Sequence, residues 1–272
     1  MRFCAESTER MDDRNWTVRI GDLLLRLRRQ RARRAELRQL AYQTEKALGL
    51  TEGHDQFTRE LVAHATSVRR RIEKVTPVHP AARVLEVGSG AHGLIFFLGF
   101  RNAIGVDPLA DTYRALFPQW QRRAKTLRAY GEALPFDDAS FDLVLCDNVI
   151  DHAERPGAIL EEIARVLRPR GTLYFSVHVH HPIYAAASIV HAAWNAAGLR
   201  YEIGPFADHT VHFTLPMIRA RLRSLPIRVL RESTGIDVAK EGANGRALLH
   251  TSDLIKRVFF KNARFEIVAI RT

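Results

Sequence analysis

The feature that most constrains this chain is a glycine turn between two short apolar runs, VLEVGSGAHGLIFFLGFRNAIGVD. Gly88, Gly90 and Gly93 lie in the turn. Glu86 closes the first apolar run, and Asp107 closes the second. A hydrophobic strand followed by a glycine-rich turn is typical of α/β folds that bind a nucleotide-like cofactor at the turn. The stretch therefore predicts such a unit, with a ligand site beside the glycines.

Short apolar runs alternate with helical segments from Arg83 onward. The pattern predicts helices from the turn through Phe100, over 111–120 and over 157–168, each between two apolar runs. Two further runs, IRVLRES and RFEIVAIR, predict strands near the end of the sequence. Alternation of this kind is typical of a Rossmann-like, doubly wound and mostly parallel sheet with helices on both faces. Ligands of such sheets bind at the carboxyl ends of the strands.

The first part of the chain has a different pattern. Apolar residues recur near helical spacing over residues 15–50 and 55–75, and two prolines follow. We therefore divide the chain into a basic helical N-terminal extension, residues 1–78, and a Rossmann-like domain, residues 79–272. The first predicted helix contains the strongly basic stretch Arg26–Arg38. We interpret this stretch as a solvated face, with an anionic lipid surface or a phosphate backbone as the alternatives.

The chain as a whole is basic, with 41 Lys and Arg against 30 Asp and Glu and a net charge of +11. Only six of the cations are lysines, and this excess of arginine is as typical of a GC-rich genome as of an acidic partner. The two cysteines do not form a disulfide framework, and no apolar run has the length of a signal peptide or a membrane span. These features predict a cytoplasmic protein, for which peripheral membrane contact stays open.

Two kinds of cofactor fit the glycine turn. The spacing of Gly88, Gly90 and Gly93, with Asp107 after the next apolar run, matches the dinucleotide fingerprint. Glu86 argues against a dinucleotide, because a carboxylate beside a pyrophosphate repels it at a cost of about 1 kcal/mol or more. A cofactor that has no phosphate and carries a cationic group avoids this repulsion. S-adenosylmethionine is such a cofactor, since it carries an ammonium and a sulfonium group.

Several motifs resemble those of a known family. VLEVGSG with IGVD, GEALPFDDASFDLVLCDNVIDH and RVLRPRGTLYFSV, in this order, are similar to the successive motifs of class I S-adenosylmethionine-dependent methyltransferases. The closest similarity is to the group that includes ubiquinone and menaquinone biosynthesis enzymes. The resemblance runs from Val84 to Val177. It implies a sheet of seven strands, of which the last is antiparallel, and S-adenosylmethionine as the cofactor.

The resemblance also implies roles for particular residues. Gly88, Ser89 and Gly90 would let the backbone approach the methionine part of the cofactor, and Glu86 would organise that pocket. Asp107 would accept charge-assisted hydrogen bonds from both ribose hydroxyls. Glu132 and Ala133 would lie along the adenine edge. Asp147 and Asn148 would lie beside the transferred methyl group.

One position departs from the pattern of the family. His92 stands where the third glycine is usual, and Gly93 follows one place late. We therefore expect a variant turn with His92 near the carboxylate of the cofactor. The departure affects the geometry expected for the turn and leaves the class unchanged.

A hydroxyl acceptor needs a base, and histidine is the usual base at neutral pH. Six histidines are candidates: His152, His178, His180, His181, His209 and His212. We favour His152 and His209, and His152 has an alternative interpretation as a structural partner of Asp151. His209 lies in an insertion, residues 180–216, where related enzymes have a lid over the acceptor. A second insertion covers residues 232–262. The histidine-rich stretches in and beside the first insertion lack a recognised metal spacing, so no metal site is predicted.

The sequence thus predicts an enzyme that transfers a methyl group from S-adenosylmethionine to a small-molecule acceptor, in the first place a hydroxyl, in a biosynthetic pathway. Two alternatives stay open. One is a methyltransferase of RNA or another macromolecule that uses the basic N-terminal helix, and the other is a non-catalytic scaffold that holds the cofactor. A dinucleotide-dependent oxidoreductase is the least favoured class. The sequence leaves a homodimer open.

Overall fold

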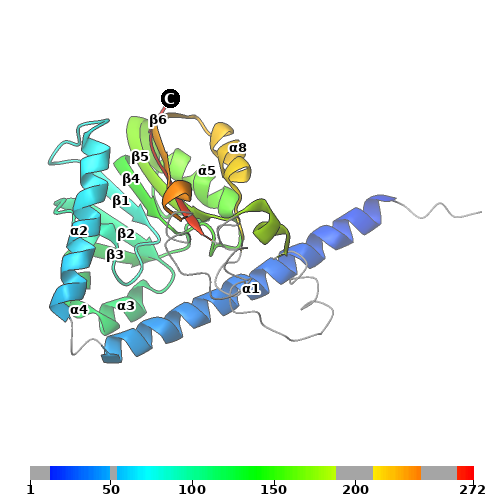
Figure 1. Ribbon diagram of the computed structural model, residues 1–272, viewed down its shortest axis with the longest axis horizontal. Helices are drawn as coiled ribbons and strands as arrows, with labels where there is room; N and C mark the ends of the chain where they lie inside the picture. Colours follow the sequence, from blue (N-terminus) through cyan, green and yellow to red (C-terminus); the bar gives the residue numbers. More distant parts are fainter. Residues whose placement is uncertain (1–12, 50–53, 188–210, 240–261) are drawn as a thin grey trace, which may run out of the picture.

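The computed structural model describes residues 13–49, 54–187, 211–239 and 262–272 of the chain. Its centre is a single sheet (Figure 1). The strands are β1 (Arg83–Val87), β2 (Asn102–Asp107), β3 (Lys125–Arg128), β4 (Phe141–Asp147), β5 (Leu167–Val179), β6 (Ile227–Thr234) and β7 (Ala263–Arg271).

The strand order is β3-β2-β1-β4-β5-β7-β6. The pairs from β3 to β5 are parallel, whereas β7 is antiparallel to both β5 and β6. The prediction of a Rossmann-like sheet of seven strands, with the last one antiparallel, is confirmed. Because β1 to β5 run in the same direction, the loops after β1, β2, β3 and β4 all lie at one edge of the sheet.

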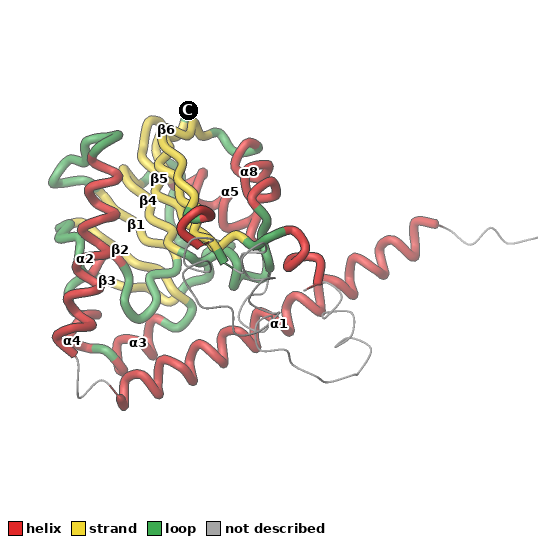
Figure 2. Tube along the Cα trace, viewed as in Figure 1, coloured by secondary structure: helices red, strands yellow, loops and turns green. Residues whose placement is uncertain are grey.

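Helices cover both faces of the sheet (Figure 2). The helices are α1 (Asp13–Gly49), α2 (His54–Glu73), the 3₁₀ helix η1 (Leu94–Phe96), α3 (Ala110–Leu116), α4 (Pro118–Gln121), α5 (Pro156–Val166) and α8 (Leu215–Arg223). One face packs against α2, η1, α3 and α4, and the other against α5 and α8. Among the described residues, no helix is long and apolar enough to cross a bilayer.

The alternation of side chains along the strands produces two apolar cores. Val84 of β1 packs with Val68 and Ile72 of α2 on one face, whereas the next residue, Leu85, packs with Ile159 of α5 on the other. All five side chains are buried. Successive residues of a strand point to opposite faces, so a continuous apolar run is required where both faces are covered. The division of the chain at residue 78 stays a prediction, and α2 shares its core with β1.

Helix α1 runs across the carboxyl ends of the strands and extends beyond the body of the molecule (Figure 1). Arg29 Nε lies 2.9 Å from Glu154 Oε1, in the loop after β4. Further along α1, Ala35 and Gln43 are buried. The structure describes five arginine side chains of the basic stretch. Four are exposed, namely Arg26, Arg29, Arg33 and Arg34, and Arg38 is half-buried.

Two predicted helices differ from the structure. The helix expected from the glycine turn through Phe100 is wrong, because only η1 forms there and Gly99, at φ +73°, turns the chain toward β2. The helix expected over 111–120 is divided into α3 and α4. Pro118 restricts the residue before it to extended conformations, so Phe117 leaves the helical region at φ −131° and ψ 55°. The parts of the two insertions at 188–210 and 240–261 lie outside the described residues.

Arg170 provides a test of backbone strain near the start of β5. Its φ of +63° lies in the left-handed region, where a side chain costs about 1–2 kcal/mol and glycine costs little. Because glycine also loses more chain entropy on folding, we expect Arg170→Gly to raise the free energy of unfolding by about 0.5–1 kcal/mol in urea denaturation. Arg228→Gly, on the exposed strand β6, is the control and should lower it. A lower stability for Arg170→Gly would contradict the prediction.

Candidate functional site

The glycine turn forms a tight loop at the end of β1. Gly88 and Gly90 have φ of +72° and +55°, the left-handed conformation that glycine adopts without strain. The N–H groups of Gly88 and Ser89 donate to the carbonyl oxygen of Val106 at 2.8 and 3.1 Å. A Cβ atom on Gly88 would lie 2.5 Å from a methyl carbon of Val149, so the loop also packs against the segment after β4. The sequence therefore places glycine where the backbone requires it.

Glu86 organises the chain that follows this loop. Its carboxylate oxygens accept hydrogen bonds from the N–H groups of Leu94 and Ile95 at 2.9 and 3.0 Å, and the residue is only 2% exposed. The pKa of Glu86 is raised to about 8, mainly by burial. The two N–H donors act in the opposite direction, and the charges of Asp147 and Asp107 contribute to the increase. The carboxylate thus binds the amino end of η1 and lies between the ends of β2 and β4.

Gly93 and His92 have different roles from those expected. A Cβ atom on Gly93 would lie 2.5 Å from Glu86 Oε2, so the late glycine is required by the carboxylate. The His92 ring packs against Phe117 and Trp120 with centroid distances of 4.6 and 4.9 Å. Burial and the nearby Lys46 lower the pKa of His92 to about 3. This environment favours a neutral packing residue over the expected partner of a cofactor carboxylate.

Asp107 connects the glycine loop to β2. Asp107 Oδ2 accepts from the N–H of Gly90 at 3.0 Å, and Oδ1 accepts from the N–H of Leu109 at 2.8 Å. Burial raises the pKa of Asp107 to about 6; the two N–H donors lower it, and the Glu36 carboxylate of α1 raises it. Each carboxylate oxygen can accept a second hydrogen bond. Asp107 is therefore able to hold a ligand at the loop while it fixes the loop itself.

The Ser89 side chain and the loop after β3 complete this edge. Ser89 is buried, and its Oγ would lie 2.6 Å from a Cβ atom on Gly105, so the side chain packs beneath the loop and only its backbone is left for a ligand. Glu132 Oε1 accepts from the N–H of Arg155 at 3.3 Å. Ala133 is exposed. The structure thus brings both residues of the predicted adenine edge to the loops at the carboxyl ends of the strands.

Asp147 ends β4 and Asn148 follows it, and the side chain of Asp147 is held by other residues of the protein. Its Oδ2 lies 2.8 Å from His64 Nε2 of α2, and its Oδ1 accepts from Ser176 Oγ and Arg264 Nη2. Burial alone raises the pKa of Asp147, but these three partners lower it below its ordinary value. Asn148 is left-handed, with φ +58°, and its buried Oδ1 has no hydrogen-bond partner in the described structure.

His64 was missed by the sequence analysis. It lies on α2, 83 residues before Asp147, and no spacing connects the two. The predicted His152 is close to Asp151, with 3.8 Å between its Nε2 and Asp151 Oδ1, and it stays a candidate. His209 lies outside the described residues. Within the described ranges, no cluster of three or more His, Cys, Asp or Glu side chains is arranged to bind a metal ion.

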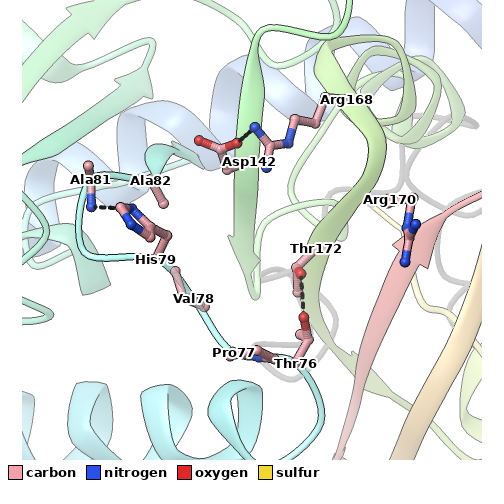
Figure 3. A pocket seen from close by; sticks show the side chains of 10 residues that line it. All are labelled: Thr76, Pro77, Val78, His79, Ala81, Ala82, Asp142, Arg168, Arg170 and Thr172. Atoms are coloured by element: carbon pink, nitrogen blue, oxygen red, sulfur yellow. Dashed lines mark hydrogen bonds and ion pairs between the residues drawn. The ribbon is translucent and has the colours of Figure 1, made fainter.

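A pocket of about 360 Å³ lies at the opposite, amino-terminal edge of the sheet (Figure 3). The segment between α2 and β1, with Thr76 and His79, forms one side, and Asp142, Arg168 and Thr172 form the other. Thr76 and Thr172 are joined by a hydrogen bond, and Arg168 pairs with Asp142. The pocket contains none of the residues predicted from the motifs, so it is separate from the candidate cofactor site.

The strand order, the left-handed glycine loop and the acids near the carboxyl ends of β1 and β2 define a Rossmann-like cofactor-binding domain. Residues 85–175, from β1 into β5, match the family model described as methyltransferase domain. An uncharacterized methyltransferase of Mycolicibacterium gilvum is 39% identical over 101 residues, 35% of this chain and 39% of the relative. One from Mycobacterium tuberculosis (strain H37Ra) is 34% identical over 130 residues, 45% of this chain and 50% of the relative.

The chain thus spans half or less of the length of these curated relatives. Among solved structures, geranyl diphosphate methyltransferase in complex with S-adenosylmethionine (SAM) is similar at a TM-score of 0.54 and 13% identity. That alignment covers 76% of this chain and 85% of the other, and it shows the shared fold. The matched segment is therefore similar in sequence to a methyltransferase domain, and the chain shares its fold with a solved methyltransferase.

Gly93→Ala tests the close approach of Glu86. The new methyl group would meet Glu86 Oε2 and the carbonyl oxygen of Ser89, both at 2.5 Å, so the loop must move. We expect a loss of about 1–3 kcal/mol in the free energy of unfolding, measured by urea denaturation. Gly49→Ala is the control, because a Cβ atom there meets nothing within 4 Å. Equal stability of the two variants would contradict the assigned geometry.

The raised pKa of Glu86 predicts a pH dependence of stability. The folded protein keeps a proton on Glu86 up to about pH 8, whereas the unfolded chain releases it near 4.5. The resulting stabilisation is complete below about pH 4.5 and is lost as the pH rises to 8. Relative to wild type, Glu86→Gln should gain on the order of 1–3 kcal/mol between pH 5 and 8.5 in urea denaturation. The exposed Glu161→Gln should show no such trend, and a flat difference for Glu86→Gln would refute the shift.

Proposed function

We propose that this protein is a methyltransferase that binds S-adenosylmethionine at the glycine loop and methylates a small molecule. The observation that supports this proposal best is the pair of acids at this edge, the buried Glu86 of β1 and the half-buried Asp107 at the end of β2, which accepts from the N–H of Gly90. The Asp107 carboxylate disfavours a pyrophosphate at this loop and favours a cofactor that offers hydroxyl donors and a cationic group, and the Glu86 carboxyl provides no positive charge that would offset a pyrophosphate. The match of residues 85–175 to a methyltransferase domain supports the same reading.

The residues present suit this cofactor. Asp107 has one unused lone pair on each oxygen for the ribose hydroxyls, and the left-handed Gly88 and Gly90 expose backbone without a Cβ atom. The unpaired Asn148 Oδ1 is a buried acceptor at the end of β4. When bound, S-adenosylmethionine supplies a methyl group on a positively charged sulfur. The protein would orient it and exclude water, which is where most of the acceleration of such a displacement can come from.

The acceptor class and setting are also part of the proposal. A hydroxyl compound of a biosynthetic pathway, as in the ubiquinone and menaquinone group, is the acceptor that the motif resemblance favours. Helix α1 and the predicted lid at 180–216 would cover it, and a cytoplasmic setting and a homodimer remain compatible with this arrangement. Geranyl diphosphate, the compound that names geranyl diphosphate methyltransferase, is one compound to test as the acceptor.

The exposed arginines of α1 support a second candidate, a methyltransferase of RNA. Arg26, Arg33 and Arg34 are exposed on a helix that extends from the body of the protein. Affinity for RNA that arises from phosphate contacts should fall by orders of magnitude between about 50 and 200 mM salt. Filter binding at these two salt concentrations compares wild type with a variant in which all three arginines are replaced by glutamine. This comparison distinguishes an RNA acceptor from a small-molecule acceptor.

The direct test supplies S-adenosylmethionine with an isotopically labelled methyl group and a metabolite extract of the host, and mass spectrometry identifies the labelled product. A new labelled metabolite would support the small-molecule acceptor. Cofactor binding without any labelled product, in extract or RNA, would favour the non-catalytic scaffold.

Asp107→Ala tests the cofactor site itself. Loss of two charge-assisted hydrogen bonds, each worth about 1.5–3 kcal/mol, should weaken binding of S-adenosylmethionine by on the order of 100-fold or more in isothermal titration calorimetry. Asp111→Ala is the matched control, because Asp111 is an exposed acid of α3 paired with Arg114. Unchanged affinity in Asp107→Ala would show that the ribose assignment is wrong.

A further inference from the structure

We propose that His64 of α2, oriented by Asp147, is the base that takes the proton from a protic acceptor, in the first place a hydroxyl. This inference rests on the proposed methyltransferase function. His152 and His209 are candidates from the sequence. His64 is inferred from a contact between two segments that only the tertiary structure brings together. Asp147 would act as a positioning residue, and His64 would be the catalytic residue.

The geometry fixes which nitrogen of His64 is available. His64 Nε2 lies 2.8 Å from Asp147 Oδ2, while Asp147 Oδ1 is bound by Ser176 and Arg264. The pKa of Asp147 is lowered by these partners in spite of its burial, so the carboxylate is ionised and can only accept hydrogen bonds. His64 Nε2 must therefore carry the hydrogen in the neutral ring. The lone pair is then on Nδ1, as a base requires.

A chain of polar contacts behind Asp147 holds this arrangement. Arg264 Nη2 donates to Tyr174 OH at 3.0 Å, and Tyr174 OH is 3.4 Å from Glu266 Oε2. Glu266 Oε2 in turn accepts from Arg71 Nη1 of α2 at 3.0 Å. His64 and Arg71 are seven residues apart and share one face of the helix. Helix α2 is thus attached to the sheet at two points, which sets the orientation of the imidazole.

The position of the pair suits contact with an acceptor. Asp147 is the last residue of β4, Ser176 lies late in β5, and Arg264 lies at the start of the antiparallel β7, so all three are at the carboxyl edge. The side chain of His64 is 36% exposed, whereas that of Asp147 is 15% exposed. The carboxylate is therefore covered by protein while the imidazole remains accessible.

The proton and the electrons balance with this assignment. The acceptor oxygen forms a bond to the methyl carbon as the carbon–sulfur bond breaks. The electron pair of that bond stays on sulfur, which becomes a neutral thioether. The proton of the hydroxyl passes to His64 Nδ1, and the Asp147 carboxylate stabilises the imidazolium that results. No oxidant, reductant or metal ion is required.

His64→Gln separates a base from a structural link. The glutamine amide can still donate to Asp147 and keep α2 attached, but it provides no base. We expect total transfer of labelled methyl groups to host metabolite extract to fall by about 100-fold or more, with affinity for S-adenosylmethionine within twofold of wild type. His79→Gln, an exposed histidine at the opposite edge of the sheet, is the matched control and should retain turnover.

The outcomes separate this inference from the proposed function. Normal turnover by His64→Gln would overturn the base role alone. Weakened cofactor binding with retained turnover would also overturn it, and would place His64 beside the cofactor. Wild-type protein that binds the cofactor but labels nothing would overturn the proposed function and the base role together.

Nitrogen-15 NMR of the imidazole provides a readout that needs no acceptor. The neutral His64 ring should carry its hydrogen on Nε2, and Asp147→Asn should remove this preference and lower turnover. A His64 ring with its hydrogen on Nδ1 in the wild-type protein would overturn the proposal, because its lone pair would then face Asp147.

Discussion

The carboxyl edge of the sheet depends on the hydrogen bonds that the buried Glu86 carboxylate accepts. The carboxylate accepts from two backbone N–H groups of η1, so the chain after the glycine turn forms a short 3₁₀ turn there instead of a long helix. Its oxygen occupies the space that a side chain at Gly93 would need. Asp107, at the end of β2, adds a second acid, which accepts from the N–H of Gly90 in the same loop.

Charge is organised differently on the two halves of the carboxyl edge. Around the glycine loop, Glu86 and Asp107 are held by backbone N–H groups, and burial raises the pKa of both. Beside β4, β5 and β7, Asp147 is paired with a histidine and an arginine, and its pKa is lowered. One half therefore contains acids whose protonated form is favoured by burial, and the other contains an ionised acid that is paired with an imidazole and a guanidinium. Such a division of labour between neighbouring carboxyl groups is set by environment and not by residue type.

The N-terminal helices contact the sheet and the loops at this edge. Helix α2 contributes apolar side chains to the core beneath β1 and polar ones to Asp147 and Glu266. Helix α1 reaches both sides of the edge, through Arg29 to Glu154 and through the charge of Glu36 to Asp107. A ligand bound at the loops after β1 and β2 would therefore lie near α1.

The sequence by itself determined the Rossmann-like sheet and the loops that carry Glu86, Gly88, Gly90 and Asp107. Strand alternation and glycine turns are local properties, and their order along the chain leaves few topologies. The sequence did not determine the short η1 turn, since helical spacing cannot show that a carboxylate from the preceding strand would bind its N–H groups. Nor could it pair His64 with Asp147, because residues 83 positions apart meet only when α2 packs on the sheet. Contacts within a strand and its turn are set by adjacent residues, whereas the chemistry of the carboxyl edge is set by which segments the packed core brings together.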